Sequence, residues 1–398
     1  MKNILLSTFF LSFFSVSFAQ YQVGNKQVFI KDNSRQRTIN TFVYYPAEAD
    51  SADAPIINDG TKFPVISFGH GFVMSSLAYQ WLAQALVPYG YIIGFPATEE
   101  GIPNHAEFGK DEIAVARALK DYGDFSTSFL YQKVNGYTAV GGHSMGGGAS
   151  FLGMQNVSDI TTFFNFAAAE TLGLYGTVAT QAAKNCTQPA LVFSGSKDCV
   201  APAVGNSKTM YQNLKSDYKF FANIKDGSHC QFADGNKTPC EAGETLACLG
   251  TTYISRINQQ SRIILLLKPW LDFWLKRDCA AITTFYNNST ANLTNIDTLQ
   301  FKVIDCSALS ITSAIKQSKL VNVSLFPNPS NGLFNLETNG NYTNTVLSLF
   351  DITGKLMDTR SYKNQHAIQL NYSHLAKGMY QLQLNTENGN YFSKIIIE

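Results

Sequence analysis

One short stretch of the sequence combines a nucleophile with an unusual density of glycine. Residues 141–150 read GGHSMGGGAS and contain the pattern G-x-S-x-G around Ser144. The residues before it resemble a buried strand and those after it a helix, so the serine is predicted to sit on a tight, strained turn. Its hydroxyl would project above a sheet, at a helix N-terminus that favours negative charge. The alternative is a glycine-rich turn with an incidental serine.

A serine hydroxyl is a poor nucleophile unless a base takes its proton. Two downstream loops supply candidates, because Asp198 and His229 each follow an apolar strand, in SGSKDCVAP and KDGSHCQF. They come in the order Ser, acid, His that such sites use on open sheets. We predict that His229 accepts the Ser144 proton and that Asp198 orients the imidazole. Asp226 and Asp234, on the histidine's own loop, are competing acids.

Acyl transfer also needs donors for a negatively charged tetrahedral oxygen. The N–H of Met145, directly after the nucleophile, is the first candidate. FGHGF (68–72) follows an earlier strand, and its glycine at 71 permits close backbone approach, so Phe72 is predicted to give the second N–H. We interpret His70 as a structural residue of that loop.

The elements that must position these residues alternate between strand and helix. Helical spacing marks 77–90, 111–123 and 261–276, and apolar strands are expected at 36–46, 64–72, 91–97, 161–168 and 189–195. Residues 137–155 are expected to form a strand, a sharp turn and a helix. Such alternation predicts an α/β fold with a mostly parallel sheet. Functional sites on these sheets lie at the carboxyl ends of the strands, where both glycine-rich turns fall.

The first residues and the cysteines indicate export. Residues 1–19 contain Lys2, an apolar run and a small-residue cleavage signal, which together predict a removable signal peptide. Seven cysteines favour disulfides and leave at least one thiol unpaired, and the spacings typical of a zinc site are missing. A net charge of +1 gives no reason to expect nucleic-acid binding, and no further apolar run is long enough to span a membrane.

The chain changes character after Cys306. We expect a catalytic domain over 20–306, a polar linker over 307–322 and a small all-β module over 323–398. The module consists of short alternating strands separated by turn signals such as FPNPSNG and DITGK.

The motifs FGHGF, GHSMGGG, GSKDCVAP and GSHC resemble those of α/β-hydrolase polyester hydrolases, the cutinase-like and poly(ethylene terephthalate) (PET) hydrolases. The resemblance covers about residues 35–306. It implies a secreted serine carboxylester hydrolase that forms an acyl-enzyme on Ser144, needs no metal or organic cofactor, and acts as a monomer on an ester or polyester. The alternatives are a small-molecule esterase or lipase, and a catalytically silent surface adhesin.

The same resemblance implies a substrate surface. Phe72 would offer an aromatic face, with Val73 beside it, and Val200 would line the pocket two residues after the acid. Family members usually carry a tryptophan after the next strand that stacks on an aromatic substrate, but here Glu170 or Thr171 occupies that region. Stacking is worth about 0.5–1.5 kcal/mol, so its loss weakens but does not forbid binding of aromatic polyesters.

The resemblance also suggests disulfides. Cys199 follows the acid and Cys230 follows the histidine, so a bridge between them would tie the two loops together. A C-terminal pair, Cys279–Cys306, resembles that of the family. The remaining local pair is then Cys240–Cys248, with Cys186 free.

The tail resembles a second family. VSLFPNPSNGLFNLE, LFDITGKL and LAKGMYQLQL look like the C-terminal sorting domain of type IX secretion. This implies recognition by secretion machinery, passage through the outer membrane, and release or surface attachment. The alternative is a carbohydrate- or surface-binding β module.

Overall fold

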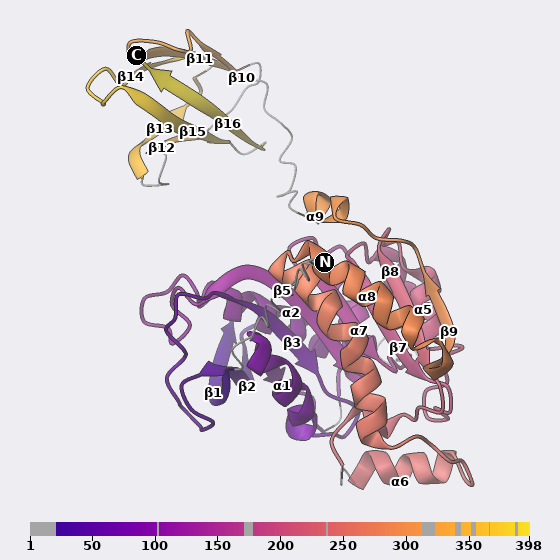
Figure 1. Ribbon diagram of the computed structural model, residues 1–398. Coiled ribbons are helices and arrows are strands. Elements are labelled where there is room, and N and C mark those ends of the chain that lie inside the picture. Colours follow the sequence, from indigo (N-terminus) through magenta and orange to yellow (C-terminus); the bar gives the residue numbers. More distant parts are fainter. Residues whose placement is uncertain are drawn as a thin grey trace, which may run out of the picture. The chain divides into compact units, whose positions relative to one another are not determined.

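The computed structural model describes residues 21–101, 103–170, 178–235, 238–312, 323–338, 344–351, 356–365, 367–386 and 389–398. The chain divides into two compact units, one ending at Leu309 and one beginning at Ser310 (Figure 1). The expected signal peptide lies outside the described residues. So does the expected linker, except for the short helix α9 (Ser307–Thr312).

The first unit is built on a sheet of nine strands within the described residues, in the order β1-β2-β4-β3-β5-β6-β7-β8-β9. The strands from β4 to β8 in this order run parallel, whereas β1, β2 and β9 pair antiparallel at the two edges. Their bounds are β1 (Gln22–Asp32), β2 (Arg37–Ala47), β3 (Phe63–Gly69), β4 (Ile92–Pro96), β5 (Val134–His143), β6 (Thr162–Phe166), β7 (Ala190–Gly195), β8 (Lys219–Ile224) and β9 (Ile296–Phe301).

Helices cover both faces of this sheet. Side chains of α1, α7 and α8 form one core layer, and those of α3, α4 and α5 form the other with part of α2. Figure 1 shows α7 and α8 crossing in front of the strands. The helices are α1 (Gln80–Leu86), α2 (His105–Asp121), α3 (Met145–Gly153), α4 (Ala179–Ala182), α5 (Ser207–Asn213), α6 (Thr238–Ala247), α7 (Arg256–Lys276) and α8 (Cys279–Ala291).

Coverage on both faces explains the sequences of the central strands. Every residue of β3, β4, β6 and β7 is buried, so these strands are continuous apolar runs rather than alternating ones. Fully burying a side chain such as Phe164 contributes about 1.5–3 kcal/mol. The parallel α/β architecture with a following all-β module is as the sequence predicts.

Two helices differ from the expected bounds. The segment 77–90 forms α1 between two 3-10 turns, because Pro88 and Gly90 end the regular helix early. Helix α2 begins at His105 rather than at 111, since the Asn104 side chain accepts the N–H of Glu107 and caps the helix there.

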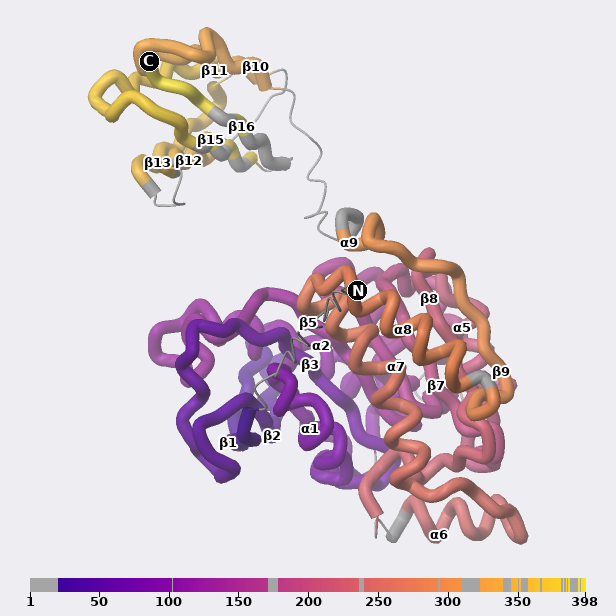
Figure 2. Tube along the Cα trace, in the orientation of Figure 1, coloured from indigo at the N-terminus to yellow at the C-terminus, as the bar shows by residue number. Residues whose placement is uncertain are grey.

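The second unit consists of two small antiparallel sheets, one of β10, β11 and β14 and one of β13, β12, β15 and β16. Figure 2 traces it at the orange to yellow end of the colour scale. Apolar side chains of both sheets, including Leu336 and Leu382, share one core. The strands are β10 (Val323–Phe326), β11 (Leu333–Thr338), β12 (Asn344–Asp351), β13 (Leu356–Lys363), β14 (Ala367–Asn371), β15 (Gly378–Thr386) and β16 (Gly389–Ile397).

Candidate active site

Ser144 lies on the sharp turn between β5 and α3. Its backbone has φ 54° and ψ −115°, a conformation that costs on the order of 1–3 kcal/mol for a residue other than glycine. Two glycines make the turn possible. A Cβ on Gly142 would lie 2.3 Å from the carbonyl carbon of Gly146, and one on Gly146 would lie 2.5 Å from the carbonyl group of Gly69. The glycines are there because the turn, the helix and strand β3 approach each other through their backbones.

Three polar side chains from three strand ends meet at this turn. His229 follows β8, and its Nε2 lies 2.8 Å from Ser144 Oγ. Its Nδ1 lies 2.7 Å from Oδ2 of Asp198, which follows β7. All three side chains are buried, with Ser144 retaining 8% of its exposure. Serine, imidazole and carboxylate therefore form one continuous chain of hydrogen bonds.

The second oxygen of Asp198 fixes the carboxylate in place. Oδ1 accepts the N–H groups of Val200 and Ala201 at 2.9 and 2.8 Å. The competing acids are engaged elsewhere. Asp234 accepts the N–H of Gln80 at the start of α1, and Asp226 lies at the surface, 3.5 Å from Lys197.

The charges around His229 stabilise the protonated form of its imidazole. Burial of the ring opposes its charge, but the carboxylates of Asp198 and Glu244 outweigh this and raise the pKa of His229 above its ordinary 6.5. A base with a raised pKa is a stronger proton acceptor toward a serine hydroxyl.

The oxyanion donors that the sequence predicts are the backbone N–H groups of Phe72 and Met145, and the N–H of Gly146 donates to the carbonyl oxygen of His70 and so joins their two segments. Within the part of the chain that the structure describes, the N–H groups of Phe72 and Met145 have no protein acceptor. The carbonyl of Gly71 accepts the N–H of Met74, which orients the following trans peptide and hence the Phe72 N–H. His70 Nδ1 lies 2.8 Å from the same carbonyl oxygen, and its Nε2 lies 2.7 Å from that of Thr98. His70 is thus a buried structural residue of this loop, as the sequence interpretation has it.

A buried hydrogen-bond chain links this loop to the histidine. The N–H of Gly71 donates to Tyr79 Oη at 2.8 Å, and Tyr79 Oη lies 2.8 Å from His143 Nδ1. Nε2 of His143 lies 3.1 Å from the carbonyl oxygen of His229. Since a carbonyl only accepts, His143 carries its proton on Nε2 and accepts from Tyr79. Sequence reasoning did not predict the link, because its partners lie far apart in the chain.

Two family models match the chain. Residues 38–260, more than half of the chain, match a family model described as PET hydrolase-like. The chain belongs to the PET hydrolase-like family. Residues 324–398 match the secretion system C-terminal sorting domain, so this PET hydrolase-like protein is a secreted one. A search of curated proteins gave no match.

Three apolar side chains that the sequence predicts to bind substrate are exposed on this PET hydrolase-like unit. Phe72, which follows Gly71 in the chain, is 58% exposed. Val200 is 44% exposed, although its backbone N–H donates to the buried carboxylate of Asp198. Val73, also exposed, has φ 53°, a rare conformation for a β-branched residue. Their exposure leaves apolar surface available to a substrate.

The region that replaces the family's stacking tryptophan is partly described. The carboxylate of Glu170 accepts the N–H groups of Ala179 and Thr180 at 2.7 and 2.9 Å and so holds the start of α4. A role of Glu170 in substrate binding stays a prediction. Thr171 lies outside the described residues.

Two of the three expected disulfides are wrong. The pairs are Cys199–Cys248, Cys230–Cys240 and the expected Cys279–Cys306, with Cys186 free and buried. The cause is α6, which the sequence analysis did not predict and which contains Cys240 near its start and ends directly before Cys248. Eight residues of helix span about 12 Å, beyond the roughly 7 Å limit for bridged Cα atoms. Each end of α6 instead bonds to a cysteine beside Asp198 or His229.

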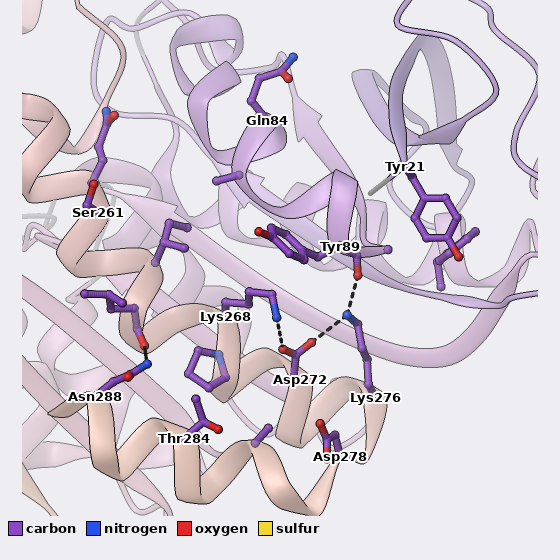
Figure 3. A pocket seen from close by; sticks show the side chains of 18 of the residues that line it. Tyr21, Gln84, Tyr89, Ser261, Lys268, Asp272, Lys276, Asp278, Thr284 and Asn288 are labelled. Atoms are coloured by element: carbon purple, nitrogen blue, oxygen red, sulfur yellow. Dashed lines mark hydrogen bonds and ion pairs between the residues drawn. The ribbon is translucent and has the colours of Figure 1, made fainter. Parts of the chain in front are cut away.

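A pocket apart from the Ser144 site lies on the same unit. It has a volume of about 1130 Å³, is lined mainly by α1, α7 and α8, and does not include the Ser144 site among its lining residues (Figure 3). Asp272 binds Lys268 and Lys276 there. Within the described ranges, no cluster of three metal-binding side chains occurs, and no helix is long and apolar enough to cross a membrane.

Proposed function

We propose that this secreted PET hydrolase-like protein is a serine carboxylester hydrolase that cleaves polyester chains. The observation that carries the proposal is the chain from Asp198 through His229 to Ser144, with contacts of 2.7 and 2.8 Å at a strained turn. These residue types in this geometry activate a serine hydroxyl for acyl transfer.

The reaction proceeds in two halves. Ser144 Oγ attacks the ester carbonyl carbon while His229 Nε2 takes the hydroxyl proton, and the carbonyl oxygen becomes an oxyanion. When the tetrahedral intermediate collapses, His229 returns the proton to the leaving alcohol and an acyl-enzyme remains. Water then attacks the acyl-enzyme with His229 as base, which releases the acid and restores Ser144.

Two further features lower the barriers of these steps. The N–H groups of Phe72 and Met145 donate to the oxyanion, and losing one such donor costs about 3–4 kcal/mol in the transition state. Asp198 keeps the proton of His229 on Nδ1 and stabilises the imidazolium. Neither contribution requires the substrate to enter a deep cavity.

A polymer is favoured over a small ester by the exposed apolar surface. Phe72, Val73 and Val200 are large apolar side chains that remain exposed on the loops that carry the predicted oxyanion donor and Asp198. A chain end or loop of an apolar polyester could lie across such a surface and bury it. We propose that this surface, rather than Glu170, supplies the apolar binding energy.

The test uses the secreted chain and its Ser144→Ala variant. Hydrolysis of p-nitrophenyl esters from acetate to palmitate is measured together with terephthalate release from polyester film. Film release that is lost in Ser144→Ala supports the proposal. Ser144-dependent ester hydrolysis without film release restricts the function to small esters, and no Ser144-dependent hydrolysis refutes it.

A further inference from the structure

The backbone of the triad histidine is held by a buried carboxylate from another element. Glu244, in the middle of α6, is only 7% exposed. Its Oε1 accepts the N–H groups of His229 and Cys230 at 2.5 and 3.1 Å, and its Oε2 accepts the hydroxyl of Ser228 at 3.3 Å. Charge-assisted hydrogen bonds of this kind are about twice as strong as neutral ones. Three consecutive residues of the histidine loop therefore take their position from one side chain.

The helix that carries Glu244 is itself fastened to both catalytic loops. Near its start, Cys240 is bonded to Cys230, the residue after His229. Just past its end, Cys248 is bonded to Cys199, the residue after Asp198. The two bridges flank Glu244 on either side, so α6 cannot move away from the site without moving the loops as well.

The negative charge of Glu244 also affects the pKa of His229. The groups that contact His229 are Asp198 after β7, Glu244 on α6 and His143 at the end of β5, and the charges of Glu244 and Asp198 act on Tyr253, which follows α6. Burial holds the pKa of His143 well below 6.5, and burial with the nearby carboxylates raises the pKa of Tyr253, so both are neutral near pH 7. The carboxylate of Asp198 contacts the imidazole and that of Glu244 accepts the backbone N–H of the same residue, and the charge of Glu244 adds to that of Asp198 in raising the pKa of His229.

We propose that Glu244 is a positioning residue of the reaction, which fixes the His229 backbone for its contact with Ser144 and stabilises the imidazolium through space. The proposal rests on the serine hydrolase function above. On this proposal, α6 contributes no group that touches the reacting atoms. Its Glu244 instead positions His229 and stabilises the positive charge of the imidazolium.

The variant Glu244→Gln separates this role from a merely structural one. Glutamine keeps the length of the side chain and one acceptor oxygen but removes the charge. We expect kcat to fall between about 10- and 100-fold, the scale of a displaced catalytic group, with little change in KM. The acid limb of the kcat/KM profile should also move to lower pH, because the protonated imidazole loses a stabilising charge.

Glu241→Gln is the matched control on the same helix. The Glu241 side chain is 38% exposed and lies 2.8 Å from Arg256. Its neutralisation should leave kcat and the acid limb unchanged. Glu244→Asp keeps the charge but shortens the reach, so it should lower kcat while its acid limb stays close to that of the unmodified protein. This variant also serves if Glu244→Gln does not fold.

The outcomes distinguish the two proposals. If Glu244→Gln matches Glu241→Gln, or if its kcat falls with no movement of the acid limb, the role of Glu244 is refuted while the hydrolase function stands. If the unmodified protein hydrolyses no ester, the function fails. The pH titration of the His229 Nδ1–H resonance by NMR then tests Glu244 separately, and an equal midpoint in both Gln variants would overturn the inference.

Discussion

Replacing Tyr79 with phenylalanine removes one oxygen from the middle of the buried chain that links the Phe72 loop to His229. The Tyr79 side chain is fully buried, and its hydroxyl bonds the N–H of Gly71 and Nδ1 of His143 at 2.8 Å each. Phenylalanine fits the same space but leaves both buried groups without that partner. Each such group costs about 1–3 kcal/mol, so we expect the free energy of unfolding to fall by about 2–6 kcal/mol.

Tryptophan fluorescence during chemical denaturation measures this loss in the catalytic unit alone. All three tryptophans of the chain, Trp81, Trp270 and Trp274, lie in the first unit. Activity should fall as well, since Gly71 precedes the Phe72 donor and a lost donor lowers kcat by up to about 10²–10³-fold. We expect a decrease of kcat of roughly tenfold or more toward p-nitrophenyl butyrate.

Tyr44→Phe is the control for Tyr79→Phe. Tyr44 is also buried, but its hydroxyl has one contact of 3.2 Å to the Gln80 side chain. Its loss should cost about 1 kcal/mol or less and leave kcat unchanged. Equal unfolding free energies and equal kcat values in the two variants would refute the argument that the Tyr79 chain supports the site.

Three other predictions test separate parts of the account. Gly146→Ala places a Cβ 2.5 Å from the Gly69 carbonyl group and should abolish most ester hydrolysis, whereas Gly243→Ala, which meets nothing within 4 Å, should retain full activity in the same assay. His229 acts as a base only when its imidazole is neutral, and its pKa is raised. We therefore expect kcat/KM to fall as the pH is lowered, with a midpoint above pH 6.5. A midpoint below pH 6.5 would contradict this. Burial raises the pKa of the Cys186 thiol to about 12. Ellman's reagent at pH 8 should therefore detect no thiol in the native protein and one thiol after unfolding without reductant. A reaction of the native protein would show that Cys186 is accessible.

The sequence was sufficient to group the three triad side chains. Ser144, Asp198 and His229 come one, three and five residues after strands of the parallel part of the sheet, and the carboxyl ends of such strands meet at one edge. Chain position alone therefore predicts their proximity. The tight turn could also be predicted, because backbones that approach this closely require glycine at positions 142 and 146.

The supporting contacts could not be predicted in this way. The contact from His143 to His229 joins residues 86 positions apart, and that from Glu244 to His229 depends on how α6 packs. The segment that forms α6, TPCEAGETLA, has a proline and a glycine, which weaken its helical signal. Without that helix, the cysteines beside Asp198 and His229 were expected to bond to each other. The error in the disulfides thus follows from one missing element.

The central claim is that His229 activates Ser144 as a nucleophile. The most direct measurement is the rate of labelling by a fluorophosphonate probe, with the modified residue identified by mass spectrometry, in the unmodified protein and in Ser144→Ala and His229→Ala. We expect a single label on Ser144, none in Ser144→Ala, and labelling slowed at least about a thousandfold in His229→Ala. A label on another residue, or an unchanged labelling rate without His229, would contradict it.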